Sequence, residues 1–375
     1  MTDNNENKVL NVPHLRFPEF TEEWVNVSLK DVADFQKERI SSGLLDESTY
    51  ISTENILQNF QGVQSAISIP ANTNVVAYKK NDILLSNIRP YLKKVWFSDR
   101  IGGCSADVFV LRSKTCEPEF LYNVIASDKF INYVMSGAKG VKMPRGDKNQ
   151  MESFSFSIPA VVEQRKISRL FQLLDERIVT QNKIIEDLKK LKSAIRKKMF
   201  SLLKDEYTES FEINQLLDYE QPTAYIVAND EYSTDTSLTP VLTANKGFIL
   251  GYTDEKFGIY QKGECIIFDD FTMDAKYVSF PFKVKSSAIK ILTAKPNVNL
   301  RFMFEYLSYW ELKSEGHKRH YISEIASLVI ELPSKERQSI IASLMTSLNS
   351  KLDIEAKTKI RYEEQKRYLL SQMFI

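Results

Sequence analysis

The stretch from Pro159 to Phe200 constrains the fold of this chain more than any other part of the sequence. It contains no glycine, and no proline after its first residue. Ten of its positions recur at alternating spacings of four and three residues, the pattern of a coiled-coil seam, and eight of them are apolar. These positions are Ile167, Phe171, Leu174, Ile178, Gln181, Ile185, Leu188, Lys192, Ile195 and Met199. At ~1.5 Å per residue a continuous helix here would be about 60 Å long, so we expect a rigid strut.

The same pattern occurs again 174 residues further along the chain. Pro159 aligns with Pro333 and Lys192 with Lys366, and both copies close on a Met-Phe pair. Two matching seams are buried most simply against each other, and the long segment between them allows an antiparallel pairing. The alternative is two unrelated surface helices. The predicted packing residues are Ile167, Phe171, Leu174, Ile178, Leu188, Ile195, Ile341, Leu348, Leu352 and Leu369.

The segments between the predicted helices also repeat. From Tyr50 to Leu111, short β-branched and aromatic runs, residues 62–69 among them, indicate strands. Residues 117–136 have the spacing of one helix. The second half follows the same order, but it is eight residues shorter between Asn55 and Asp82 and again between Ala126 and Met151, which marks surface loops. We therefore predict an α+β protein with globular domains at 1–158 and 205–332 and long helices at 159–204 and 333–375.

Composition limits the class of protein. A length of 375 residues favours two or three domains. Three cysteines without a C-x-x-C pair argue against a disulfide framework or a zinc site. The sequence has no apolar signal region at its start and no apolar run of membrane-spanning length, so we expect a cytoplasmic protein. Residues 160–200 hold eleven Lys and Arg against five Asp and Glu, so a polyanion could bind along a stripe.

The common motifs of catalytic sites are absent from the sequence. It has no phosphate-binding G-x-x-x-x-G-K-[ST], no G-x-G-x-x-G, no H-E-x-x-H, and no Asn/Asp-Pro-Pro-aromatic tetrad of an amino-methyltransferase. His317 and His320 are three residues apart, but no carboxylate or thiol completes a metal-ligand set. Glu264, Asp269 and Asp270 could form a nuclease cluster, although adjacent aspartates on an extended strand face opposite ways.

Basic residues mixed with aromatics and amides give a stronger signal. Asn87, Arg89 and Tyr91 follow the apolar run 82–86, which we predict to be a buried strand, and would lie at its exposed end. Arg and Asn can bind guanine and adenine edges in the major groove, and lysines can neutralise phosphates. A second basic loop, 139–148, contains glycines that would allow a close approach to a DNA backbone. The predicted DNA contacts of the first half are Ser86, Asn87, Arg89, Tyr91, Lys93, Lys94, Lys142, Arg145 and Lys148.

The second half has a counterpart of each cluster. Asp269 or Asp270, at the place of Asn87, could accept a hydrogen bond from a cytosine amine. A basic segment at 317–320 corresponds to the glycine-containing loop. The bland alternative for each cluster is a solvated loop, but repetition at equivalent places favours function. The predicted contacts of this half are Lys246, Asp269, Asp270, Thr272, Lys276, His317, Lys318, Arg319 and His320.

The layout resembles the specificity (S) subunit of bacterial Type I restriction-modification systems over almost the whole chain. The resemblance rests on the paired segments IPAVVEQRKISRLFQLLDERI and LPSKERQSIIASLMTSLNSKL, on the closing KKMF and SQMF, on VPHLRFPEF with Trp24, and on KKNDILLSNIRP and IIFDDFT. It implies that 1–158 and 205–332 are target recognition domains, each reading one half of a bipartite double-stranded DNA site. It also implies that 159–204 and 333–375 are antiparallel spacer helices that dock two modification subunits.

The resemblance further implies that this chain is not an enzyme and holds no cofactor. Modification subunits would methylate adenine N6 with S-adenosylmethionine, and restriction subunits would use ATP and Mg for translocation and cleavage. Recognition domains vary greatly within the family, so the base-reading residues rest on composition and loop position alone. A strut of about 60 Å could hold two domains on DNA segments roughly one 34 Å helical turn apart, and its length would act as a ruler.

Two other functions remain open from the residues. A coiled-coil adaptor could use the same helices while its globular halves bind protein. A stand-alone nuclease would cut DNA with a divalent metal and would depend on Asp269 and Asp270.

Overall fold

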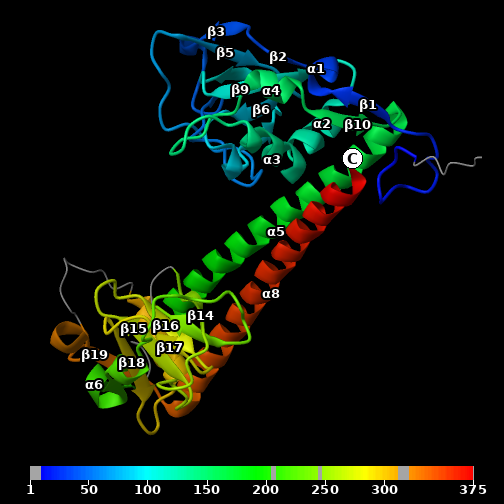
Figure 1. Ribbon diagram of the computed structural model, residues 1–375. Helices are drawn as coiled ribbons and strands as arrows, with labels where there is room; N and C mark the ends of the chain where they lie inside the picture. The colour runs from blue at the N-terminus through cyan, green and yellow to red at the C-terminus, as the bar shows by residue number, and fades with distance from the viewer. Residues whose placement is uncertain (1–9, 204–207, 244–246, 311–320, 375) are drawn as a thin grey trace, which may run out of the picture. The chain divides into compact units, whose positions relative to one another are not determined.

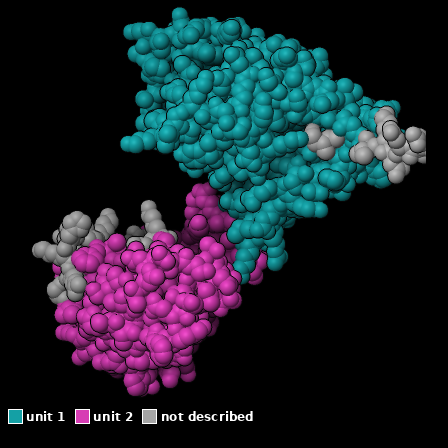
Figure 2. Space-filling view, viewed as in Figure 1, with its two compact units in different colours: residues 1–182, 357–375 teal, residues 183–356 magenta. Residues whose placement is uncertain are grey.

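The computed structural model describes residues 10–203, 208–243, 247–310 and 321–374 (Figure 1). The chain forms two compact units, unit 1 with residues 1–182 and 357–375 and unit 2 with residues 183–356 (Figure 2). Two long helices, α5 (Val161–Leu202) and α8 (Lys335–Met373), each contribute to both units. Neither helix contains glycine or proline, so no residue in them interrupts the backbone hydrogen bonds.

Unit 1 is built on three small sheets around an apolar core. The first sheet has the strand order β2 (Ala33–Phe35), β9 (Val108–Ser113), β6 (Ile83–Ser86), β7 (Val95–Phe97). The second has the order β3 (Arg39–Ser41), β5 (Asn74–Tyr78), β8 (Gly102–Cys104), β4 (Tyr50–Ile51). The third pairs β1 (Val25–Ser28) with β10 (Ser155–Ile158). The helices are α1 (Leu29–Val32), α2 (Pro118–Ile125), α3 (Asp128–Ser136) and α4 (Lys148–Glu152). Every residue of β6 is buried, as its continuous apolar sequence predicts.

Unit 2 repeats this plan. Its first sheet has the strand order β12 (Leu217–Glu220), β18 (Ile289–Ala294), β15 (Cys265–Asp269), β16 (Ala275–Val278). The second has the order β14 (Ile249–Thr253), β13 (Thr239–Leu242), β17 (Lys283–Val284). The third pairs β11 (Glu209–Glu212) with β19 (Val329–Leu332). Its helices are α6 (Ile213–Leu216) and α7 (Leu300–Tyr309). The order β12-β18-β15-β16 matches β2-β9-β6-β7 strand for strand, whereas the other larger sheets differ in strand order.

One pair of hydrogen bonds occurs identically in both units. In unit 1 the Gln164 amide donates to the Pro159 carbonyl oxygen at 2.8 Å and accepts from the Glu117 backbone N–H at 2.8 Å. In unit 2 Gln338 donates to the Pro333 carbonyl oxygen at 2.9 Å and accepts from the Asn299 N–H at 2.8 Å. Each long helix is thus joined in the same way to the domain that precedes it. The predicted internal repeat is confirmed.

The two long helices run antiparallel where they meet. In unit 1, Phe171 of α5 lies beside Phe374, at 5.7 Å between ring centroids, and Asp175 binds Lys366 of α8 at 2.6 Å, so rising numbers on α5 face falling numbers on α8. In unit 2 both helices contact Glu305 of α7. The predicted α+β fold with paired antiparallel helices is therefore confirmed. Of the predicted packing residues, Ile167, Phe171, Leu174 and Ile341 are buried, and Ile178, Leu188, Ile195, Leu348, Leu352 and Leu369 are half-buried.

Two local predictions were wrong. The single helix expected at 117–136 is divided into α2 and α3, because the Ser127 hydroxyl accepts from the Phe130 N–H at 3.2 Å and caps a new helix. Residues 62–69 form no strand and contribute only an isolated bridge between Ile56 and Val63. In the described part of the chain, no helix combines the length and the apolarity needed to cross a membrane.

Candidate nucleic-acid interface

The loop after β6 carries the first predicted cluster. Ser86 ends the strand inside the domain, where its hydroxyl donates to the Ile88 carbonyl oxygen at 3.0 Å. Arg89 follows with a left-handed backbone, φ 50° and ψ 62°, and begins the short 3₁₀ helix η2 (Pro90–Leu92). Arg89 and Tyr91 are exposed. The chain therefore turns sharply out of a buried strand and presents these side chains at its end.

The second basic loop lies directly against this turn. The Arg89 N–H donates to the Pro144 carbonyl oxygen at 2.8 Å, and the Gly146 N–H donates to the Asn87 carbonyl oxygen at 3.1 Å. An isolated bridge also pairs Ile88 with Arg145. Two clusters that the sequence places more than 50 residues apart thus form one surface of unit 1.

The cations on this surface differ in how they are held. Lys93 binds Asp128 at 2.5 Å, and Arg145 binds Asp107 at 2.6 Å. Lys148 pairs with Glu152 at 3.3 Å and lies over the Phe35 ring. Sequence reasoning did not name Asp107 or Asp128, because nothing local marks them as partners of these cations.

Lys94 is held further inside. Its ammonium donates to the Thr53 carbonyl oxygen at 2.5 Å. Burial lowers the pKa of Lys94, Glu54 opposes this shift and nearby Arg89 adds to it. Lys94 therefore stabilises the loop, and its ammonium is less available to a phosphate than that of an exposed lysine.

The remaining groups have unused hydrogen-bonding capacity. Within the described residues, Arg89 and Lys142 have no ion-pair partner although both are exposed. The side-chain oxygen of Asn87 is buried and lacks a hydrogen-bond partner among the same residues. Unsatisfied polar groups of this kind are rare in folded proteins and often mark sites that a ligand completes. Arg89, Tyr91 and Lys142 therefore form the part of unit 1 best prepared to bind a polyanion, whereas the Asn87 oxygen needs a hydrogen-bond donor such as a base amine.

The equivalent loop of unit 2 uses its carboxylates internally. Asp269 accepts from the Phe271 and Thr272 N–H groups at 2.9 Å each. Asp270 is buried, lies 3.5 Å from the buried Lys290 ammonium and accepts from the Tyr321 N–H at 2.8 Å. Both carboxylates are buried and bonded within unit 2, whereas the predicted contact with a cytosine amine requires an accessible carboxylate.

Other predicted contacts of unit 2 divide into two groups. Thr272 is exposed and Lys276 half-buried on the strand side of the same loop. The rest lie outside the described residues: Lys246, His317, Lys318, Arg319 and His320.

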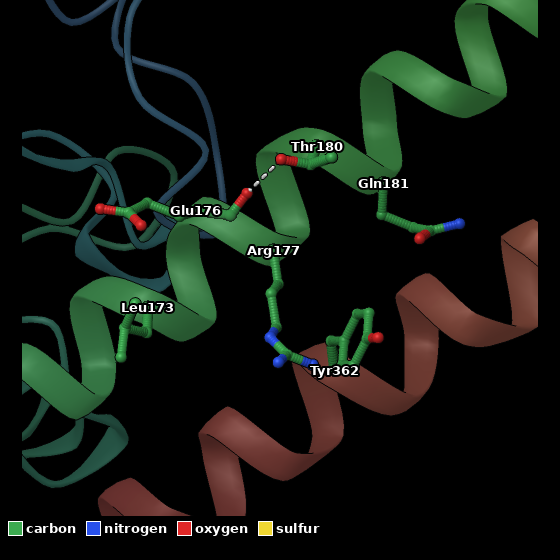
Figure 3. Close-up of a pocket in the computed structure, with 6 residues that line it drawn as sticks. All are labelled: Leu173, Glu176, Arg177, Thr180, Gln181 and Tyr362. Carbon is green, nitrogen blue, oxygen red and sulfur yellow. Dashed lines mark hydrogen bonds between the residues drawn. The ribbon is translucent and has the colours of Figure 1, made fainter.

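A shallow groove of 320 Å³ lies on the helix pair of unit 1 (Figure 3). Arg177 of α5 points towards Tyr362 of α8, with its guanidinium carbon 6.0 Å from the ring centroid. The remaining lining residues are Leu173, Glu176, Thr180 and Gln181. The groove offers a cation, an aromatic ring and a carboxylate to a partner, and no nucleophile paired with a base.

The cysteine thiols are buried, and the possible metal ligands of the described residues are scattered. Within the residues that the structure describes, no three His, Cys, Asp or Glu side chains are grouped to hold a metal ion. Burial raises the pKa of Cys104, Cys116 and Cys265 to about 12, which leaves these thiols protonated and unreactive near neutral pH.

Comparison with known proteins gives a consistent result. The family model described as Type I restriction modification DNA specificity domain matches the chain twice, over residues 21–190 and 206–364. The specificity subunit of the Escherichia coli Type I restriction enzyme EcoR124I/EcoR124II is 39% identical over 178 residues, which cover 42% of this chain and 43% of that protein. The MjaVIII specificity subunit of Methanocaldococcus jannaschii is 27% identical over 192 residues, 50% of this chain and 43% of that protein. The chain thus aligns with less than half the length of each of these relatives.

Solved structures extend the likeness to the whole fold. The S subunit of a Type I restriction-modification system from M. genitalium matches with a TM-score of 0.65 and 15% identity, over 97% of this chain and 99% of that one. A chain from a study of complex assembly and conformational transition of the Type I system matches with a TM-score of 0.58 and 16% identity, over 96% and 99%. At these identities the likeness concerns the fold alone.

Proposed function

This chain belongs to the family of Type I restriction-modification DNA specificity domains, and from that premise we propose that it is the subunit that selects the DNA target of such a complex. The observation that carries the proposal is the duplication. One chain contains two domains with the same central strand order, each joined by the same glutamine bridge to a long helix. Two similar readers on one chain suit a bipartite double-stranded site.

We assign one half-site to the surface of unit 1 described above. Arg89 and Asn87 would read base edges, and Lys142 would neutralise a phosphate. In unit 2, Thr272 and Lys276, with Lys246 and the segment 317–320, would read the other half-site. Exposure supports the assignments of Arg89, Lys142 and Thr272. Charge and the equivalent places of the loops in the two repeats, read from the sequence, support the others.

Catalysis would belong to partner subunits. We propose that two modification subunits dock on α5 and α8 and methylate adenine N6 with S-adenosylmethionine. Restriction subunits joined through them would use ATP and Mg, all within the bacterial cytoplasm. The groove between Arg177 and Tyr362 is a candidate for one of these contacts.

Methylome sequencing tests the proposal. A host would express the chain with its cognate modification subunit, the chain alone, or the modification subunit alone. We expect a new bipartite N6-methyladenine motif only when both proteins are present. If no motif appears while the same modification subunit is active beside another specificity subunit, the DNA-reading role is lost and a coiled-coil adaptor becomes the better explanation.

A further inference from the structure

A short hairpin projects from the candidate interface of unit 1. Lys139 and Arg145 exchange both backbone hydrogen bonds, at 3.0 and 2.9 Å, and enclose a five-residue turn from Gly140 to Pro144. Gly140 has a φ of +96°, a conformation that favours glycine, so the turn depends on this residue. We refer to residues 139–145 as the tip hairpin.

The tip hairpin is held at its base rather than left loose. Arg145 binds Asp107, and Lys139 binds Asp147 at 2.9 Å. The Pro144 carbonyl oxygen accepts from the Arg89 N–H, which fixes the hairpin to the turn after β6. A ligand that contacts Arg89 would therefore meet the hairpin in a defined position.

The end of the hairpin carries two apolar side chains among several basic ones. Val141 is fully exposed and Met143 is 48% exposed, with Lys142 between them. Moving apolar side chains out of water lowers the free energy. The exposure of Val141 and Met143 beside the unpaired Arg89 and Lys142 is therefore explained if a bound polyanion covers them. In the major groove of DNA, the apolar group available is the C5-methyl of thymine.

We propose that Val141 and Met143 recognise a thymine methyl in the half-site read by unit 1. This inference rests on the proposed function and adds two specificity residues that no charge or hydrogen-bonding pattern marks. The two cations bring the hairpin to the phosphates, and the apolar pair then distinguishes a base that carries a methyl from one that does not. The hairpin also lies in a stretch, 126–151, that is eight residues longer than its counterpart in the second repeat. The contact thus belongs to one half-site.

The test removes the methyl from the DNA and the apolar groups from the protein. The complex of the full chain with its modification subunits would be titrated with duplexes that carry the mapped motif, with each thymine replaced in turn by uracil. We expect uracil at one position of one half-site to weaken binding of the wild-type complex about fourfold, the effect of one apolar carbon returned to water. Val141→Asn with Met143→Gln, which replace the apolar groups by polar ones of similar size, should bind thymine and uracil equally.

Two controls make the result decisive. Ile101→Thr changes an exposed apolar side chain of the same unit outside the hairpin and should keep full discrimination. Melting curves verify that the hairpin variant is folded. A wild-type complex that prefers its motif but never distinguishes thymine from uracil overturns the hairpin proposal alone, as does a folded variant that still discriminates. A complex with no preference for any duplex overturns the proposed function as well.

Discussion

Arg89 holds a backbone conformation that is unfavourable for a residue with a Cβ atom. Its φ of 50° and ψ of 62° lie in the left-handed region, which costs roughly 1–2 kcal/mol for an ordinary L-residue. The surrounding loop imposes this conformation through the bond from the Arg89 N–H to Pro144. Strain of this kind persists at binding sites, where the direction of the side chain matters more than stability.

The variant Arg89→Gly should therefore change protein stability and target binding in opposite directions. We expect the melting temperature to rise slightly, because glycine adopts this conformation without strain. We expect target binding to weaken by about 1–3 kcal/mol and the motif to relax at one base position. Asn81→Gly is the matched control, since Asn81 also has a positive φ, 70°, but lies in a different turn. Stability gained at Arg89 with an unchanged motif would remove this residue from the interface.

Asp270 is a structural residue by its contacts in unit 2. It is buried beside Lys290, whose ammonium also donates to Gln221 at 3.2 Å. Removing one partner of a buried ion pair costs about 3–5 kcal/mol, so Asp270→Asn should lower the free energy of unfolding by that order. Denaturant titration measures the change. A nuclease role would instead require loss of cleavage without loss of stability.

The chain itself supplies a rescue for this variant. In the repeat, Ile88 and Val108 of unit 1 occupy the places of Asp270 and Lys290. The double change Asp270→Ile with Lys290→Val should recover much of the lost stability, because replacing a whole buried ion pair by apolar residues is often neutral. A double variant no more stable than Asp270→Asn would contradict this interpretation.

The sequence predicted where the residues of the candidate interface lie, but not which of them form ion pairs. The sequence placed Asn87, Arg89 and Tyr91 after a buried strand, and β6 ends there. It could not tell that Lys93 is neutralised by Asp128, 35 residues away, because such pairings arise only from the tertiary fold. Val141 and Met143 carry neither charge nor hydrogen-bonding groups in their side chains, so no sequence pattern of basic and amide residues includes them.

The lysine at Lys192, and its repeat equivalent Lys366, meets a carboxylate on a different element in each unit. In unit 2, Glu305 of α7 accepts from Arg196 at 2.6 Å and from Asn349 at 3.2 Å, and lies 3.8 Å from Lys192. In unit 1, Lys366 takes the place of Lys192 and binds Asp175 of α5. At the places of Glu305 and Asn349 the first repeat has Asn123 and Asp175, so the carboxylate and the amide have exchanged positions in the sequence.

Glu305→Gln should destabilise unit 2 in a pH-dependent way. Burial already lowers the pKa of Lys192, and Glu305 opposes that shift, so its removal should lower the pKa further. A lysine whose pKa is lower in the folded state binds fewer protons than in the unfolded state, so stability rises with pH towards 10.5. We expect the stability deficit of the variant relative to wild type to shrink between pH 7 and 9.5.

Asn349→Asp provides the compensating change for Glu305→Gln. It reproduces the arrangement of unit 1, where the carboxylate is carried by the long helix at Asp175. The double variant should recover stability and lose most of the added pH dependence in denaturant titrations. A deficit that is independent of pH in the single variant would mean that Lys192 does not sense Glu305.

Elements with a long period were the easiest to predict. The heptad pattern predicted α5 and α8, because in each helix about forty residues without glycine or proline repeat apolar positions every seven residues. Predictions of short elements failed where one local contact decides the outcome, as at Ser127, or where a run such as 62–69 forms only an isolated bridge. Tertiary context outweighs propensity in such segments.

At the scale of the whole molecule, the helices belong to neither domain alone. The boundary between the units falls after Asn182 in α5 and after Ala356 in α8. Both breaks lie within uninterrupted helix. An insertion at these two points would lengthen the helices without touching the globular part of either unit.

Seven residues inserted after Asn182 and seven after Ala356 should therefore change the spacing of the recognised site. The seams repeat every seven residues, so the matched pair of insertions keeps their register and should preserve the fold. Each adds about 10.5 Å of helix, the rise of roughly three base pairs, so the unspecified gap in the methylated motif should lengthen by about three. Methylome sequencing reads the gap directly. Insertion into α5 alone leaves the two helices unequal in length and displaces the pairs on one side of the insertion by one heptad, so it should lower the melting temperature and serves as the control. An active complex with the matched insertions and an unchanged gap would show that helix length does not set the spacing.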